Sequence, residues 1–180
     1  MVRGALAILL ALVAGVVVLP AAPAAAVSGY WVIVTAKVSE LIEGSGHQVE
    51  QLWHPANKSL PYNAHWNFVP LGGDDTGYWM ITSFYDRCMA TLNASTASGA
   101  RIITATCGSG RNDQWTPVLV RHDNASNLDF YNLVNRKSHL CANIQGGVTD
   151  DYADLIQYPC NSTSWNMQFN WFPSSQWPVR

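Results

Sequence analysis

Short runs of β-branched and aromatic residues recur along the chain, and helical periodicity is nearly absent. Clusters of turn-forming residues separate the runs, such as GGDDTG at 72–77 and GGVTDD at 146–151. Short strands with regular turn signals predict an all-β domain. The expected strands lie at 30–34, 49–53, 68–71, 78–82, 102–106, 117–120, 130–134 and 155–158.

One pattern of strands occurs three times. Each copy opens with an aromatic strand and closes with an Asn-x-x-aromatic tetrapeptide (NAHW, NDQW and NMQF). The closing rings are Trp66, Trp115 and Phe169. The copies span about 28–73, 74–123 and 124–173. A unit this small cannot bury its apolar face alone, so we expect twelve strands to share one core as a threefold barrel capped by hairpins, with the closing rings inside it.

The first 26 residues have the pattern of a secretory signal peptide. Arg3 supplies a positive start, Leu6 to Leu19 form an apolar run, and small residues precede a cleavage site after Ala26. The alternative is an uncleaved anchor, but the run is short for a membrane span and ends at prolines. We therefore predict a secreted, extracellular chain whose residues 27–180 form one domain without a transmembrane segment.

Four cysteines form two pairs with one interval, since Cys88 and Cys107 are nineteen positions apart, as are Cys141 and Cys160. Four cysteines allow three connectivities, and the equal separations favour one bridge inside each of the last two units. A closed loop of this size stabilises by roughly 3 kcal/mol in the chain-entropy model. The competing interpretation, a zinc site, lacks the short ligand spacing that such sites use.

Charge is sparse, at 12% of residues. Without Arg3 the chain has nine basic and twelve acidic residues, a net charge of about −3. This balance argues against nucleic acid or an anionic membrane as a partner bound through charge. The five histidines have no metal-ligand spacing, and no nucleophile elbow, phosphate loop or catalytic carboxylate pair is recognisable. We therefore expect no enzymatic activity, no cofactor and no metal.

Three such units, with cysteine pairs inside the units and closing Asn-x-x-Trp tetrapeptides, resemble the ricin B-type lectin family of β-trefoils. A unit of that family runs through Cys-x-Asp, a glycine-containing loop, Gln-x-aromatic-x-Cys and Asn-Gln-x-Trp. The second unit here reads CMATL, SGARIITATC and NDQW, the third reads CANI, LIQYPC and NMQF, and the first reads QLWHP and NAHW. The resemblance covers essentially the whole mature chain, and it implies a β-trefoil that binds galactose-type or related glycans.

In that family the aromatic residue two places before the second cysteine stacks on a sugar ring, while the carboxylate and the closing Asn bind its hydroxyl groups. The third unit matches with Tyr158 and Asn166, and it has Asn143 at the carboxylate position. An amide accepts a hydrogen bond less strongly than an ionised carboxylate. Asp150 and Asp151 have two interpretations. They are ordinary acidic turn residues, or one of them replaces the carboxylate that the third unit lacks at Asn143. The alternative to sugar stacking for Tyr158 is ordinary packing of its side chain on the strand.

The first unit offers Gln51, Trp53 and Asn63 for the same roles. Gln51 and Trp53 share one face of a strand, so we expect Trp53 to be exposed. The second unit has Ala90 and Ala105 at the two decisive positions. We expect it to contribute structure and not a sugar site.

A second function is open from the sequence: a non-catalytic subunit for protein interaction or toxin delivery. The chain has more aromatic rings than a core demands, and some of them could form a surface that faces a partner. The tail that carries Trp177 is either a strap across the barrel end or a frayed terminus. The other rings in question are Trp31, Trp79, Trp165 and Trp171.

Overall fold

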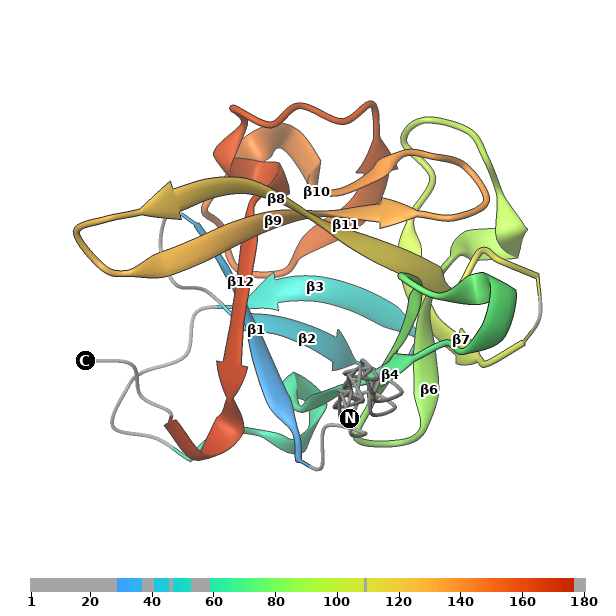
Figure 1. Ribbon diagram of the computed structural model, residues 1–180, viewed down its shortest axis with the longest axis horizontal. Coiled ribbons are helices and arrows are strands. Elements are labelled where there is room, and N and C mark those ends of the chain that lie inside the picture. The colour runs from blue at the N-terminus through green and yellow to red at the C-terminus, as the bar shows by residue number, and fades with distance from the viewer. Residues whose placement is uncertain (1–28, 37–40, 46, 53–58, 109, 177–180) are drawn as a thin grey trace, which may run out of the picture.

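The computed structural model of the chain describes residues 29–36, 41–45, 47–52, 59–108 and 110–176, and it is all-β (Figure 1). The described residues form twelve strands and six short 3₁₀ turns. They contain no helix that is long and apolar enough to cross a membrane. The predicted signal peptide, Trp53 and Trp177 lie outside the described residues.

The strands are β1 Trp31–Thr35, β2 Leu41–Ser45, β3 Gln48–Leu52, β4 Trp66–Pro70, β5 Trp79–Ser83, β6 Arg87–Thr91, β7 Ile102–Thr106, β8 Gln114–Asp123, β9 Leu128–Asn135, β10 Cys141–Ile144, β11 Ala153–Tyr158 and β12 Phe169–Pro173. The 3₁₀ turns are η1 Tyr62–Ala64, η2 Gly73–Asp75, η3 Leu92–Ala94, η4 Gln145–Gly147, η5 Trp165–Met167 and η6 Ser174–Gln176.

Six of the strands close into a ring. Strand β1 pairs with β4, β4 with β5, β5 with β8, β8 with β9, β9 with β12, and β12 with β1, all antiparallel. The other six form the hairpins β2–β3, β6–β7 and β10–β11. Strand β3 pairs with both β7 and β11, which joins the hairpins to one another. A closed ring leaves none of its strands with an open edge, and the linked hairpins form a second layer against it.

The three closing rings lie in the core, which confirms their predicted role. Trp66, Trp115 and Phe169 are fully buried in one apolar cluster. Nε1 of Trp66 donates a hydrogen bond of 2.6 Å to the backbone oxygen of Ile42, and Nε1 of Trp115 donates one of 2.8 Å to that of Met89. Each indole therefore fills the core and ties a strand of the ring to a hairpin, because its N–H needs a partner once it is buried.

Both predicted disulfides are present. Cys88 bonds Cys107 across β6–β7, and Cys141 bonds Cys160 across β10–β11, each with a Cα–Cα distance of 5.0 Å. Each bridge closes the open end of its own hairpin. The connectivity that the equal spacing favoured is therefore confirmed.

Three of the aromatic rings considered for a partner-facing surface pack against the core. Trp31, Trp79 and Trp171 are half-buried and pack against the core. With Phe68 and Pro117 they line an apolar cavity of about 150 Å³. These three rings therefore pack against the core and around this cavity.

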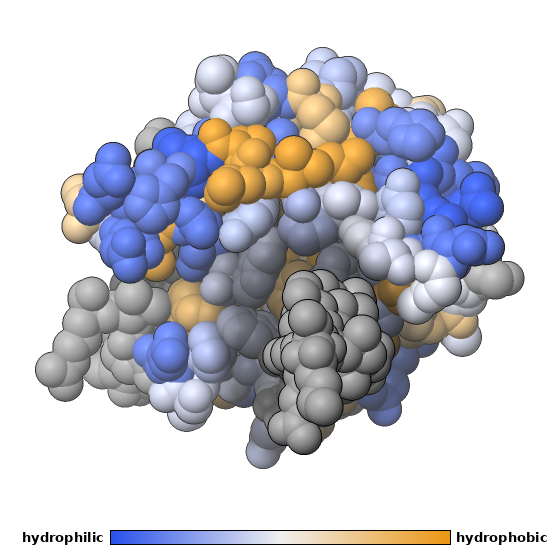
Figure 2. Space-filling model, viewed as in Figure 1, coloured by the Kyte–Doolittle hydropathy of each residue, from blue (hydrophilic) through white to orange (hydrophobic). Residues whose placement is uncertain are grey.

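Exposed apolar side chains occur instead on β8. Figure 2 shows an apolar band across one face, over β8 and β9. Val118 and Leu119 of β8 are 44% and 55% exposed. The sequence predicted a strand at 117–120, and β8 continues beyond it to Asp123, so the β8–β9 hairpin is longer than expected.

Candidate functional site

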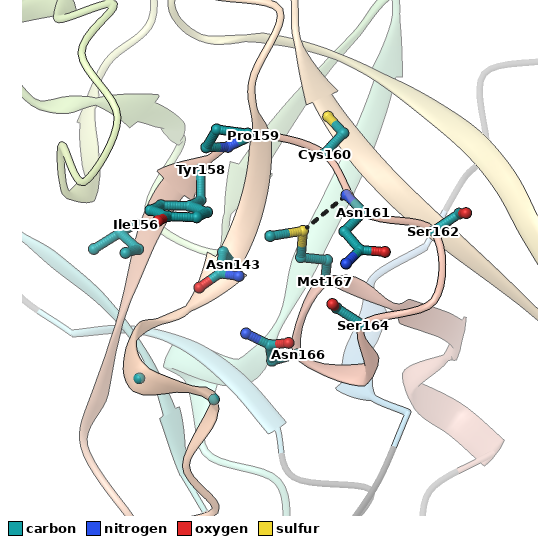
Figure 3. A pocket seen from close by; sticks show the side chains of 12 residues that line it. Asn143, Ile156, Tyr158, Pro159, Cys160, Asn161, Ser162, Ser164, Asn166 and Met167 are labelled. Atoms are coloured by element: carbon teal, nitrogen blue, oxygen red, sulfur yellow. Dashed lines mark hydrogen bonds between the residues drawn. The ribbon is translucent and has the colours of Figure 1, made fainter.

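A cavity of about 890 Å³ opens beside the β10–β11 hairpin (Figure 3). Its lining comes from the hairpin, from the two glycines of η4 and from the segment that leads through η5 towards β12. The lining residues are Asn143, Gly146, Gly147, Ile156, Tyr158, Pro159, Cys160, Asn161, Ser162, Ser164, Asn166 and Met167.

The three residues that the sequence selected in the third unit all line this cavity. Asn143 pairs with Ile156, and Cys141 pairs with Tyr158, so Asn143, Ile156 and Tyr158 project from one face of the hairpin. Figure 3 shows Asn143 between the Tyr158 ring and the Asn166 amide. Tyr158 is 49% exposed and Asn143 only 5% exposed. The ring is therefore available to a ligand, while the Asn143 amide lies deeper in the cavity.

Asn166 is held in place by the strand that it faces. Its Nδ2 donates a hydrogen bond of 3.3 Å to the backbone oxygen of Ile144. Gly147 lies against the same amide, since a Cβ added there would be 3.5 Å from Asn166 Nδ2. Gly146 and Gly147 have φ angles of 73° and 60°. Glycine adopts these left-handed angles without strain, which lets the backbone of η4 form the wall of the cavity.

The lining carries no carboxylate, ammonium or guanidinium group. Its polar groups are the amides of three asparagines, the hydroxyls of two serines and the phenol of Tyr158. Neither Asp150 nor Asp151 is part of the lining, so the structure gives no support to their replacing the missing carboxylate. Such a site offers hydrogen bonds without charge and one aromatic face, which suits a neutral ligand rich in hydroxyl groups.

Groups with shifted pKa values lie outside this lining. The pKa of Glu50 is raised, mainly because burial disfavours its charge and also because Asp154 repels it. Asp154 forms an ion pair of 2.6 Å with Arg101. The pKa of Asp75 is lowered because Arg136 donates a hydrogen bond to its carboxylate. These charges contribute to contacts between strands and loops away from the cavity.

The placement of Gln51 corrects its predicted role as a sugar contact. Its side chain is fully buried, and Nε2 donates hydrogen bonds of 2.9 Å and 3.0 Å to the backbone oxygens of Val148 and Asp150. A group without exposed surface cannot touch a bound sugar. Gln51 is therefore a structural link between β3 and the loop before β11.

Strand register also shows which position of the first hairpin corresponds to Tyr158. Trp66 bonds to Ile42 as Trp115 bonds to Met89, which aligns β2 with β6. In the hairpins Leu41 then pairs with Leu52 just as Cys88 pairs with Ala105 and Cys141 with Tyr158. The position of Tyr158 therefore corresponds to Leu52 in the first hairpin.

The rest of the first-unit set is incomplete in the described residues. Asn63 lies in η1, half-buried and three residues before Trp66, as Asn166 lies three residues before Phe169. Trp53 lies outside the described residues.

The second hairpin has alanine at the two positions that matter in the third. Ala90 is fully buried, and Ala105 takes the place that Tyr158 has in β11. Asn112 remains, and its Nδ2 donates a hydrogen bond of 3.5 Å to the backbone oxygen of Thr91. The second unit therefore offers neither an aromatic face nor an amide at the position of Asn143.

Sequence reasoning missed part of the cavity wall. Asn161, Ser162 and Ser164 line it, although they belong to an ordinary polar turn between Cys160 and the closing tetrapeptide. The backbone nitrogen of Asn161 donates a hydrogen bond of 3.3 Å to the sulfur of Met167, which fixes the start of this turn. The signal in the sequence that could have identified these residues is their closeness to Cys160, because its bridge to Cys141 holds the turn beside Tyr158.

The family model described as ricin-type beta-trefoil lectin domain-like matches residues 62–158. No curated protein matches the chain significantly.

Among solved structures, the designed threefold-symmetric protein ThreeFoil is 27% identical, with a TM-score of 0.66 over 79% of this chain and 97% of its own. The exo-β-1,3-galactanase of Clostridium thermocellum is 16% identical, with a TM-score of 0.65 over 81% of this chain but 30% of the galactanase. The ricin B-like lectin of Macrolepiota procera, solved with lactose, is 13% identical, with a TM-score of 0.61 over 80% of this chain and 94% of the lectin.

The two natural proteins share the fold alone at these identities, and the fold does not fix a function. The family model carries more weight because it covers over half of the chain, including two closing tetrapeptides and the strand that ends at Tyr158. The family predicted from the sequence is thereby confirmed: the chain belongs to the ricin-type β-trefoil lectin domain-like family.

Proposed function

We propose that this chain is a secreted, non-catalytic lectin that binds a galactose-type or related glycan in the cavity beside β10–β11. The observation that carries the proposal is the meeting of Asn143, Tyr158 and Asn166 at one cavity. The family and its lectin relatives support carbohydrate binding in general. A lectin of the same fold with bound lactose supports the galactose-type sugar.

The cavity provides the two kinds of contact that a neutral sugar needs. The half-exposed ring of Tyr158 can lie against the C–H-rich face of the sugar. The amides of Asn143 and Asn166 can donate to its hydroxyl groups and accept from them. Neutral hydrogen bonds of this kind contribute only about 0.5–1.5 kcal/mol each. We therefore expect weak affinity for a single sugar, with Kd on the order of 1 mM, and tighter binding for a larger glycan that reaches more of the wall.

The test is a glycan array with the mature protein, followed by titration of any glycan that binds. Tyr158→Ala should weaken binding by about tenfold or more, which corresponds to about 1.4 kcal/mol. Its melting temperature should stay close to that of wild type, because the ring is half-exposed. Tyr85→Ala is the matched control, since Tyr85 is 60% exposed and lies outside the cavity lining.

Binding that survives Tyr158→Ala unchanged would remove the cavity from the proposal. An array on which no glycan is bound would remove carbohydrate binding itself.

The secretory leader and the three-repeat division belong to this proposal as well. Export should remove residues 1–26, and N-terminal sequencing of the secreted protein checks this because it should begin at Val27. The division at about 28–73, 74–123 and 124–173 is supported by the corresponding indole bonds of Trp66 and Trp115.

A second candidate function is a trefoil subunit that binds a partner protein. The exposed apolar side chains of Val118 and Leu119 favour it, because contiguous apolar surface on a secreted domain is typical of a contact surface. A second chain that co-purifies in fixed stoichiometry and separates on Leu119→Ser would support this function. A monomer that binds glycan with wild-type affinity as Leu119→Ser would leave the lectin as the better description.

A further inference from the structure

The side chain of Gln51 reaches from β3 into the loop between η4 and β11. Nε2 donates to the backbone oxygens of Val148 and Asp150, and the backbone oxygen of Gln51 accepts a hydrogen bond of 2.9 Å from the nitrogen of Tyr152. Three hydrogen bonds of one residue therefore hold positions 148, 150 and 152. Gln51 is distant in sequence from this loop, since Val148 lies 97 positions further along the chain.

The same loop continues directly into the wall of the candidate site. Gly146 and Gly147 line the cavity, and Gly147 lies against the amide of Asn166. Gln51 itself is not part of the lining. Val148 is the next residue after Gly147, so the position of Val148 constrains that of Gly147 beside Asn166 without a direct contact between Gln51 and the cavity.

The loop depends on outside support for its shape. Gly146, Gly147 and Tyr152 all have positive φ, at 73°, 60° and 64°. For Tyr152 this left-handed conformation is strained, because its Cβ crowds the backbone. Such a conformation persists where neighbouring groups over-determine it. The three bonds from Gln51 supply that constraint.

We propose that Gln51 is a positioning residue for the sugar-binding cavity of the third unit, an inference that rests on the function proposed above. It acts across units: a strand of the first unit fixes the loop that shapes the binding site of the third. Its buried amide selects the conformation of 146–152 in which the wall meets Asn166. Loss of that amide lowers the fraction of molecules with a competent cavity, and apparent affinity falls in proportion.

The chain contains a matched control in Gln157. This residue is also fully buried, and its Nε2 donates hydrogen bonds of 2.9 Å and 2.8 Å to the backbone oxygens of Ser95 and Ala97. Its own backbone oxygen accepts a hydrogen bond of 2.8 Å from Gly99, as that of Gln51 does from Tyr152. The loop that Gln157 holds belongs to the second unit, which has alanine at the decisive positions.

Gln157 also loses more on substitution than Gln51 does. Its Oε1 accepts a hydrogen bond of 2.7 Å from Ser138, whereas Oε1 of Gln51 has no partner within the described part of the chain. Both variants replace Gln with Met, so they change the side-chain volume by the same amount. Gln157→Met, the control, removes at least as many hydrogen bonds as Gln51→Met. General destabilisation should be as large in Gln157→Met as in Gln51→Met.

The experiment compares wild type, Gln51→Met and Gln157→Met by titration with the best glycan from the array, at a temperature where all three are folded. We expect Gln51→Met to raise Kd by about tenfold, the result if one molecule in ten keeps a competent wall, and Gln157→Met to leave it within about twofold. Amide hydrogen exchange without ligand should rise at 146–152 in Gln51→Met and at 95–99 in Gln157→Met.

Equal Kd values for Gln51→Met and wild type would overturn the positioning role while leaving the lectin function intact. An equal loss of glycan affinity in both variants would overturn it too, because the loss would then follow from lower stability and not from a change in the cavity wall. A wild-type protein that binds no glycan would remove the proposed function, and this inference with it. Unchanged exchange at 146–152 in Gln51→Met would also refute the inference, whatever the affinity.

Discussion

Replacement of Trp115 separates the two contributions that a closing ring makes to this fold. The ring is fully buried in the shared core, and its Nε1 donates a hydrogen bond of 2.8 Å to the backbone oxygen of Met89. Trp115→Ala removes both the apolar volume and the hydrogen bond. Trp115→Phe keeps most of the volume and removes the hydrogen bond, which places at 115 the residue that the third unit has at Phe169.

The magnitudes follow from that geometry. A buried Trp→Ala change lowers the free energy of unfolding by about 3–5 kcal/mol, because it loses apolar transfer energy and leaves a cavity. In Trp115→Phe the backbone oxygen of Met89 loses its indole donor while it remains buried, which costs about 1–3 kcal/mol. At about 2–4 °C per kcal/mol for a domain of this size, Trp115→Ala should lower the melting temperature by about 6–20 °C.

The assay is reversible urea unfolding followed by fluorescence and by circular dichroism, with both disulfides intact. Coincident transitions from the two probes would show that a single free energy describes unfolding. A loss below about 1 kcal/mol in Trp115→Ala would refute the core assignment, since only a surface or relaxed site tolerates that change. Equal losses in the two variants would show that volume contributes little and that the hydrogen bond dominates.

Two further predictions concern the Cys141–Cys160 bridge and the ion pair of Asp75 with Arg136. Cys141→Ser with Cys160→Ser should lower the free energy of unfolding by roughly 3 kcal/mol, because the bridge closes a loop of 19 residues, and denaturant titration measures the change. Arg136 holds the folded-state pKa of Asp75 below its ordinary 3.8, so the pair stabilises the fold above that pH and this contribution is lost as the pH falls through the lowered pKa. Asp75→Asn should therefore be less stable than wild type at pH 7, with a difference that narrows below pH 3.8; a constant difference down to the most acid pH would contradict the assignment.

The sequence predicted most reliably those features that depend on residue type and on spacing along the chain. Trp115 and Phe169 could be placed in the core because a large ring after each Asn-x-x repeat has few other uses, and the cysteine bridges followed from equal spacing. Asn143, Tyr158 and Asn166 were chosen through the resemblance to the ricin B-type family, and the structure brings the three to one cavity. The bridge between Cys141 and Cys160 fixes the register of β10 and β11, the strands that carry Asn143 and Tyr158.

The first unit shows where such reasoning stops. It has no bridge to fix its register, and the letters Q-L-W could be aligned with the family pattern only by their identity. The pairing of Leu41 with Leu52 shifts that alignment by one residue, which turns Gln51 inward. A contact between Gln51 and Val148 was also outside the reach of local pattern, because it depends on how the units pack.

The closed ring of strands also constrains how the protein is made. Strand β1 forms a five-residue ladder with β12, so the earliest strand of the domain pairs with the latest. During synthesis β1 therefore has no partner on this side until β12 has been made, and the ring of strands cannot close before then. The first unit alone therefore cannot complete the fold, because the strand that closes the ring belongs to the third.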